Sequence, residues 1–239
     1  MSPEKADIVA IADAAERALG LQMTIRYLDM FHWQQESAAH HAARAAEPDP
    51  RLESVADHTW HMTYMVALLL PYFPQLDAQR VYGLAVLHDI LELITGDVDP
   101  TGADGTGLNA HAMNDAKMAD KNAVERAALE QYLAALPAAV QTHHRTLLEE
   151  ELAGTSDEAR FVKVLDKMQV LIYVKAKKNG TADDAALQFL YRYKHKTSPK
   201  FPALAPLYDE LFDRLVAHSA ETRGVTAAEI YQTLQAQAA

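Results

Sequence analysis

The segment VYGLAVLHDILELITGD, residues 81–97, places charged side chains inside an apolar stretch. Its first fourteen residues are apolar on nearly every side of a helical projection, which is typical of a buried central helix. His88 and Asp89 interrupt this stretch, and Glu92 follows within one helical turn of both. Charged groups are costly in a core unless they are paired or bind a ligand. We therefore interpret the segment as part of a site carried by a central helix.

The remainder of the chain also predicts helices. Good helix formers fill the segments between Pro- and Gly-containing breaks, and no sustained alternation of apolar and polar residues predicts a strand. Ser54 with Asp57, Thr181 with Asp184, and Thr226 with Glu229 have the spacing of helix-capping boxes. The pattern predicts an all-α, single-domain helical bundle. Helices are expected at 3–19, 21–42, 54–70, 77–94, 110–135, 138–152, 156–178, 182–194, 203–221 and 226–237.

Composition narrows the class of protein. The chain has 239 residues, 49% of them hydrophobic, which is enough for one well-packed core. It contains no cysteine, which excludes disulfide scaffolds, cysteine metal sites and cysteine nucleophiles. No apolar run is long enough to span a membrane, and the N-terminus is charged and amphipathic rather than a signal peptide. We expect a cytoplasmic protein, and its net charge of −11 argues against binding of nucleic acid polymers.

Two other segments supply candidate metal ligands. His58 lies in SVADHTWHM, near the start of an expected helix, and Asp166 lies within the apolar run FVKVLDKMQVLIYV. An Asp in such a run is costly unless it is paired or metal-bound. With His88 and Asp89, these residues form a set of nitrogen and oxygen donors that suits Mn, Fe, Co, Ni or Zn better than Ca or Mg. The alternative for Asp166 is an ion pair with Lys163 or Lys167.

Three blocks of sequence carry a family resemblance. RLESVADHTW (51–60), AVLHDILELITGD (85–97) and SDEARFVKVLDKMQ (156–169) resemble the HD-domain metal-dependent phosphohydrolases, in the branch that contains the 5′-deoxynucleotidases. The resemblance implies one HD-type domain over residues 1–239, with a core at about 51–178. The N-terminal helices would lie within 3–42 and the C-terminal helices within 182–237.

The resemblance also implies roles. One divalent transition metal ion (Mn, Co, Fe, Ni or Zn) would bind four side chains: His58, His88, Asp89 and Asp166. Glu92 would orient or deprotonate the attacking water. Asp97 would hold the sugar, and Arg51 would face the phosphate or support the first histidine. The implied substrate is a (deoxy)nucleoside 5′-monophosphate, and the implied assembly is a homodimer.

The chain departs from this branch in two regions. Members carry an Arg-Trp pair in an early helix, where this chain has Arg26 and Tyr27 within IRYLDMFHW, followed by a longer stretch at 34–50. The loop DVDPTGADGTGLN is unusually rich in glycine, and Lys117 and Lys121 follow it one helical turn apart. These four side chains are candidate substrate contacts, each weighed against an ordinary surface position. Three further aromatic residues are interpreted as core: Trp60, Tyr64 and Tyr82.

Three alternatives stay open at this point. A triphosphohydrolase acting on deoxynucleoside triphosphates would use Lys117 and Lys121 for the longer phosphate tail. A di-iron oxygenase would add His111, His143 and His144 as ligands. A non-catalytic protein could also have kept the fold.

Overall fold

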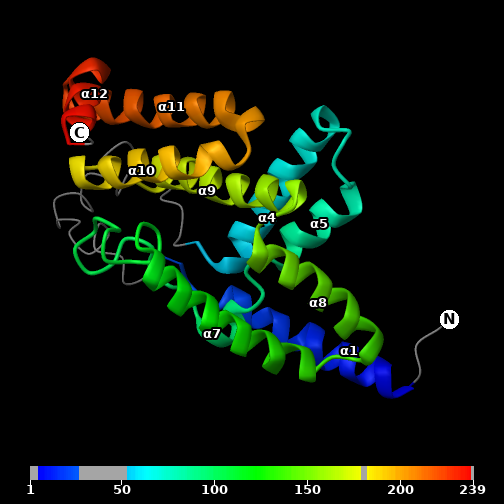
Figure 1. Cartoon of the computed structure of the whole chain (residues 1–239). Coiled ribbons are helices and arrows are strands. Elements are labelled where there is room, and N and C mark those ends of the chain that lie inside the picture. Colours follow the sequence, from blue (N-terminus) through cyan, green and yellow to red (C-terminus); the bar gives the residue numbers. More distant parts are fainter. Residues whose placement is uncertain (1–4, 27–52, 179–181, 238–239) are drawn as a thin grey trace, which may run out of the picture. The chain divides into compact units, whose positions relative to one another are not determined.

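The computed structural model describes residues 5–26, 53–178 and 182–237 (Figure 1). Within these residues the backbone is helical apart from turns and one isolated bridge between Ile25 and Ser54, so the all-α prediction is confirmed. None of the described helices is both long enough and apolar enough to cross a membrane. The α-helices are α1 (Lys5–Ala18), α4 (Val55–Leu69), α5 (Ala78–Leu87), α6 (Glu92–Thr95), α7 (Asp115–Ala134), α8 (Ala138–Ala153), α9 (Asp157–Lys178), α10 (Asp184–Thr197), α11 (Ala205–Arg223) and α12 (Ala227–Ala236). Short 3-10 helices are η1 (Leu19–Gln22), η2 (Leu70–Tyr72), η3 (Ser198–Lys200) and η4 (Pro202–Leu204).

The described residues gather into two compact units. Unit 1 contains the residues up to Arg26, Glu53–Val98 and Ala119–Lys163. Unit 2 contains Asp99–Met118 and the residues from Val164 onward. Helix α9 is continuous through the boundary. The prediction of a single domain stays a prediction.

Unit 1 is built around α5, which packs against α4 and α8. Met62 and Val66 of α4 and Val81 and Leu84 of α5 are buried between these helices. Gly83 allows α5 and α8 to approach closely, because a Cβ atom at this position would lie only 2.8 Å from Leu147 Cδ1. Val81, Leu84, Ala85 and Leu87 are therefore buried, whereas Tyr82 and Val86 are exposed. The prediction that the helix is buried on nearly every side is thus wrong.

The predicted helix over 77–94 is wrong in one respect: it breaks at the His–Asp pair. Helix α5 ends at Leu87, residues 88–91 form a turn, and α6 begins at Glu92. Backbone bonds in the turn span three residues instead of four, for example from Ile90 N to Leu87 O at 3.0 Å. The His88 ring supplies a cause, because its Nδ1 lies 2.9 Å from Ala85 O, the acceptor that the backbone of a continuous α-helix would use next.

Other boundaries also differ from expectation. Residues 23–26 form a turn and the bridge to Ser54, so the expected helix 21–42 does not begin there, and its remainder from Tyr27 onward lies outside the described residues. The helix expected from 110 begins only at Asp115. The capping boxes at Ser54 and Thr226 are confirmed. Thr181 lies outside the described residues, and Asp183 caps α10.

Unit 2 contains the glycine-rich segment and the C-terminal helices. Helices α10, α11 and α12 pack against one another, and Figure 1 shows α10 and α11 side by side. Tyr208 and Phe212 of α11 are fully buried there. Gly107 has a φ of 74°, and a Cβ at this position would lie 2.6 Å from the Phe189 ring, so only glycine fits the turn.

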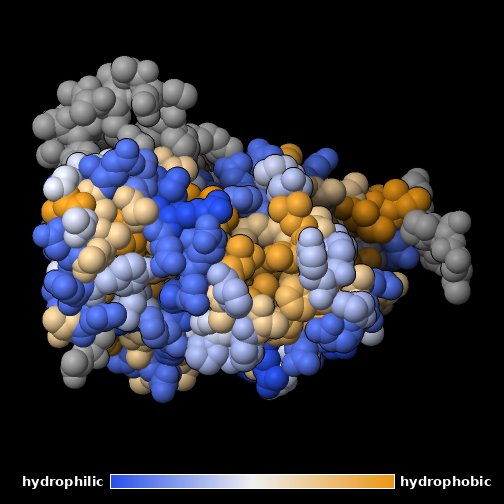
Figure 2. Space-filling view, turned by 90° about the horizontal axis from the view of Figure 1, so that it is seen from above, coloured by the Kyte–Doolittle hydropathy of each residue, from blue (hydrophilic) through white to orange (hydrophobic). Residues whose placement is uncertain are grey.

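Some large apolar side chains remain exposed. Trp60 and Tyr64 of α4 are 70% and 52% exposed and stack on each other, and Tyr82 of α5 is also exposed. The interpretation of these three aromatics as core residues is therefore wrong. Figure 2 shows hydrophobic side chains gathered at the middle right of the face it draws.

Candidate metal centre

His58 is presented by a regular, capped helix. The Ser54 hydroxyl accepts a hydrogen bond from the Asp57 backbone N–H at 3.2 Å, and the Asp57 carboxylate accepts one from the Ser54 backbone N–H at 3.0 Å. This capping box fixes the start of α4 and places His58 at the end of its first turn. The His58 side chain is completely buried. A buried imidazole needs polar partners, and its neighbours provide them.

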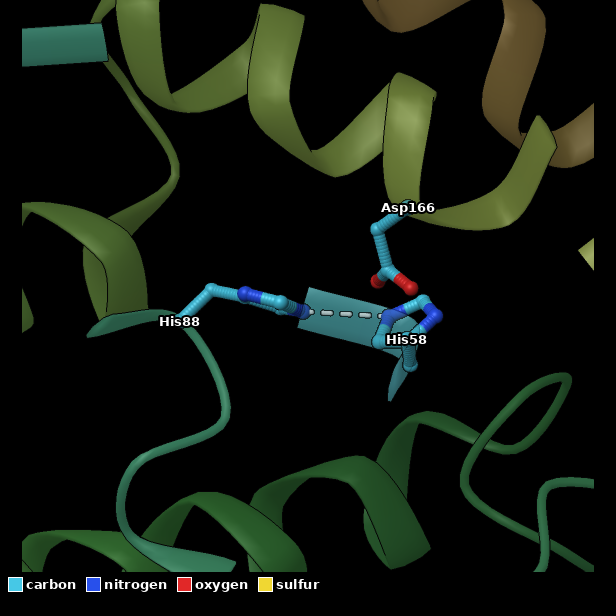
Figure 3. A group of neighbouring side chains, drawn as sticks. All are labelled: His58, His88 and Asp166. Atoms are coloured by element: carbon cyan, nitrogen blue, oxygen red, sulfur yellow. Dashed lines mark hydrogen bonds between the residues drawn. The ribbon is translucent and has the colours of Figure 1, made fainter. Parts of the chain in front are cut away.

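His88 meets His58 from the end of α5. The two Nε2 atoms are 3.2 Å apart, as the dashed line in Figure 3 marks. A proton on His88 Nδ1 would be donated to Ala85 O, which leaves the Nε2 lone pair facing His58. Two nitrogens 3.2 Å apart, each about 2.0–2.1 Å from one metal ion, would subtend roughly 100° at that ion. This value lies between octahedral and tetrahedral geometry, so the pair fits a shared metal.

Two carboxylates lie beside the histidines. Asp89 Oδ2 is 3.0 Å from His88 Nε2 and 3.6 Å from His58 Nε2. Asp166, on α9 one turn beyond the last residue of unit 1, points its carboxylate toward His58 in Figure 3. Potential ligand atoms of His58, His88 and Asp166 all lie within 4.8 Å of one another. Three of the four sequence-predicted ligands are thus brought together in one group, and Asp89 lies beside its two histidines. This donor set suits a divalent transition metal.

Glu92 begins α6 directly after the turn that carries His88 and Asp89. Its Oε2 atom is buried and accepts no hydrogen bond from the residues that the structure describes. Burial, followed by repulsion from Asp89 and then Asp97, raises the pKa of Glu92 well above its ordinary range. Arg26 and Lys121 act in the opposite direction. A carboxyl with a raised pKa beside a metal set is a candidate for handling protons.

Glu53 is a neighbour of the site that the sequence interpretation missed. It is 5% exposed, and its Oε2 lies 3.3 Å from Arg26 Nη1 and 3.9 Å from His58 Nδ1. Carboxylates behind metal-binding histidines hold the ring in place and raise its basicity. The available signal was its position in RLESVADH, next to the cap and five residues before the histidine. Arg26 accordingly pairs with Glu53 and is itself buried.

The basic residues near the predicted ligands are engaged in ion pairs. Lys121 pairs with Glu125, and Lys167 Nζ lies 2.5 Å from Asp166 Oδ2. Of the two partners considered for Asp166, Lys167 is therefore the one that pairs with it, while Lys163 pairs with Glu151 at 3.3 Å. Ion pairing and participation in the metal set are compatible, because a carboxylate has two oxygens.

The other predicted residues either lie outside this metal-ligand group or fall outside the described part of the chain. Arg51 and Tyr27 lie outside the described residues, as does the stretch 34–50. Lys117 lies in the first turn of α7, where its backbone N–H binds Asn114. His144 Nδ1 lies 2.9 Å from the Tyr132 hydroxyl, with His143 beside it. Within the described part of the chain, His58, His88 and Asp166 form the one metal-ligand group, and His111, His143 and His144 are not in it.

Comparisons with known proteins identify the family of this chain. Residues 33–205 match the family model described as HD domain. The chain is 30% identical over 175 residues to the 5′-deoxynucleotidase HDDC2 of Xenopus laevis, covering 71% of this chain and 79% of that protein. It is also 30% identical to HDDC2 of Bos taurus, covering 66% of this chain and 70% of that protein.

Solved structures show the same fold at lower identity. A predicted metal-dependent phosphohydrolase from Magnetospirillum magnetotacticum is 20% identical, with a TM-score of 0.63 and coverage of 90% of this chain and 98% of that one. A conserved hypothetical protein from Pyrococcus furiosus has a TM-score of 0.56 at 18% identity, covering 84% and 98%. The matched family model spans most of the sequence, including all three blocks that carry the histidines and aspartates. The chain therefore belongs to the HD-domain family, within its 5′-deoxynucleotidase-like branch.

Proposed function

We propose that this protein is a metal-dependent phosphohydrolase that removes the 5′-phosphate from (deoxy)nucleoside monophosphates, giving a nucleoside and inorganic phosphate. One observation carries the proposal: two buried imidazoles face each other at 3.2 Å beside the Asp89 and Asp166 carboxylates. The HDDC2 relatives support the choice of substrate, because they are named 5′-deoxynucleotidases.

The reaction explains why such a donor set is required. A phosphate monoester is a dianion and reacts with water extremely slowly without assistance. A divalent ion held by His58, His88, Asp89 and Asp166 would supply charge neutralisation and acidify its bound water. The ring of His88 would be held by its bond to Ala85 O, and the Glu53 carboxylate would lie near Nδ1 of His58. The role of the protein would therefore be to hold the two imidazoles and the Asp166 carboxylate close together, with the Asp89 carboxylate beside the histidines.

Glu92 is proposed to take the proton of the attacking water. Its raised pKa brings the carboxyl nearer to neutral pH than an exposed glutamate would be, which favours proton transfer. The positive charges of Arg26 and Lys121 act against that rise in pKa and favour the ionised carboxylate, which is the form that accepts a proton. Asp97, whose charge is felt by Glu92, is proposed to hold a sugar hydroxyl.

Positive charge for the phosphoryl oxygens has to come from basic side chains. Lys167 is the described basic residue whose ammonium group lies against a proposed ligand, Asp166. Arg51 and Tyr27 stay predicted substrate contacts, as do Lys117 and Lys121. Because Lys121 is paired with Glu125, a phosphate contact from it would require exchange of that partner.

A panel of nucleotides tests the function. Metal-stripped protein should be supplied with Mn, Co, Fe, Ni, Zn or Mg and assayed with ribo- and deoxynucleoside mono- and triphosphates. We expect phosphate release from monophosphates with a transition metal. Triphosphate released from a deoxynucleoside triphosphate would instead establish the triphosphohydrolase alternative.

Matched histidine variants separate the remaining alternatives. His88→Ala should abolish phosphate release, whereas His143→Ala, on a helix outside the metal group, should leave it unchanged. The di-iron oxygenase predicts two irons per chain and damage from His143→Ala or His111→Ala. A non-catalytic protein predicts no phosphate release from the unmodified chain with any metal.

The homodimer and the cytoplasmic location are part of the same proposal. The family resemblance and the amphipathic C-terminal segments support the dimer, and the composition, which lacks cysteine, supports the location. Sedimentation of the intact chain tests the dimer, and a single species at 26.4 kDa would contradict it.

A further inference from the structure

A pocket lies in unit 1, next to the segment that carries the proposed site. Its volume is about 490 Å³, within the usual range for small-molecule sites. Helix α1, Gly20, the segment from Ile90 to Ile94 and the C-terminal part of α7 line it. The lining includes none of His58, His88, Asp89, Glu92 and Asp97, so this pocket is separate from the metal centre.

The walls of the pocket are mostly apolar. Ala14 and Ala18 of α1 form one side, and Ile90, Leu93 and Ile94 form another. The small alanine side chains leave the space, while the branched side chains offer apolar surface to an occupant. An occupant therefore needs an apolar body.

Three of the lining side chains are polar, and one of them carries a positive charge. They are Arg17, Gln131 and Tyr132, and no carboxylate is among the lining residues. Arg17 lowers the pKa of Tyr132, against a larger upward shift from burial, so the guanidinium and the phenol lie within electrostatic reach. Arg17 Nη2 donates to Ala135 O at 3.2 Å, which anchors the side chain and leaves its other N–H groups for a ligand.

Tyr132 is held in a defined orientation. Its hydroxyl lies 2.9 Å from His144 Nδ1, and the two rings stack nearly parallel, at 9°. Burial and the neighbouring His143 lower the pKa of His144, so its neutral form is favoured. Arg17 therefore provides the full positive charge among the lining residues. One positive charge on the pocket lining matches one negative charge on a ligand.

We propose that this pocket binds a small amphiphilic carboxylate, with its apolar body against Ile90, Leu93 and Ile94 and its carboxylate at Arg17 and Tyr132. A guanidinium pairs with a carboxylate through two parallel hydrogen bonds. The ligand would contact Ile90, Leu93 and Ile94, which are chain neighbours of Asp89 and Glu92. It would reach this part of the chain without entering the metal centre.

Calorimetric titration with octanoate and with 1-octanol tests the proposal on the full chain. Octanoate should bind saturably at one site per chain, and more tightly than the neutral alcohol of equal length. Arg17→Gln should weaken octanoate roughly tenfold or more, because a charge-assisted hydrogen bond is lost. Arg126→Gln, which removes an exposed arginine from α7 outside the pocket, should leave binding unchanged. Ala18→Phe, which fills the pocket, should abolish binding.

Methyl NMR locates the ligand even if a variant fails to fold. In the unmodified protein, octanoate should shift the methyl signals of Ile90 and Ile94, and not that of Ile230 in α12. Absence of saturable octanoate binding, equal binding of the alcohol, insensitivity to Arg17→Gln, or shifts that miss Ile90 and Ile94 would each overturn the proposal.

Discussion

Two histidines meet at the candidate metal centre from opposite kinds of local structure. His58 lies in an unbroken helix that begins at a complete capping box. His88 lies where a helix stops, in a turn between α5 and α6. The first arrangement follows from local signals in the sequence. The turn at His88 does not follow from local signals. There the imidazole interacts with the backbone oxygen of Ala85, and the residues of the site depart from a regular helix.

The start of α4 was predictable from sequence, whereas the break between α5 and α6 was not. Residues 81–94 are apolar and good helix formers, so local preference favours one continuous helix. Because Glu92 begins a new helix with three-residue bonds before it, the turn sets the direction of its side chain relative to His88 and Asp89. A rule based on 100° per residue does not give that direction.

Removal of either histidine should have the largest effect on activity, even though one lies in a helix and the other in a turn. His58→Ala and His88→Ala should each lose tight metal binding and reduce phosphate release to background, because each removes a ligand. Metal content after dialysis and phosphate release measure this. Retention of metal and activity by either variant would show that the histidines do not share an ion.

Glu92→Gln tests whether the residue that follows the turn accepts a proton or supports the metal ligands. The amide keeps the shape but cannot accept the proton, so kcat should fall by about 10²–10⁴-fold while metal content is unchanged. Steady-state kinetics with a transition metal provides the measurement. If metal is lost in parallel with kcat, Glu92 supports the ligands instead of handling water.

Glu92→Gln should also change how the free energy of unfolding of the metal-free protein depends on pH. Because the folded-state pKa of Glu92 is raised, its neutral form is favoured in the fold. Below the ordinary carboxyl pKa both states are protonated and nothing is lost; as pH rises toward the raised pKa, the unfolded state ionises first and stability falls. Urea unfolding should therefore show Glu92→Gln gaining on the unmodified protein as pH rises. A gap that closes with rising pH would contradict the buried-carboxyl account.

Glu53→Gln tests the support behind His58. The substitution keeps the size of the buried side chain but removes the charge near His58 Nδ1 and Arg26. We expect metal affinity or activity to fall by about 10–100-fold. Glu150→Gln, on α8 and paired with Arg80, is the control for loss of an acidic side chain in unit 1. Equal effects in both variants would mean that Glu53 acts through stability alone.

The smallest expected effect concerns the caps. Ser54→Ala and Thr226→Ala remove equivalent capping boxes, one at the start of α4 and one at the start of α12. Each should cost about 0.5–2 kcal/mol of unfolding free energy. Only Ser54→Ala should also weaken metal binding, because α4 carries His58. Titration of both variants with Mn, at a temperature where both are folded, separates the two effects.

Much of the fold and part of the site were predictable from sequence. Ser54 and Thr226 predict the starts of their helices, because a capping box is a local interaction within four residues. The set of His58, His88, Asp89 and Asp166 was found through motif blocks, and its members lie together. The break at His88 was missed because helix propensity is local, while the exposure of Trp60 was missed because burial depends on what covers a helix face. Glu53 gave only a weak signal, since a glutamate beside a cap is most often solvated.

Metal should be titrated into stripped protein while phosphate release from thymidine 5′-monophosphate is followed in the same samples, to test whether one bound ion is required for activity. We expect activity to rise with added Mn and to reach a plateau at one ion per chain. Asp166→Ala should remove both metal binding and activity. Phosphate release that is independent of metal, or a plateau at two ions that requires His111, would contradict it.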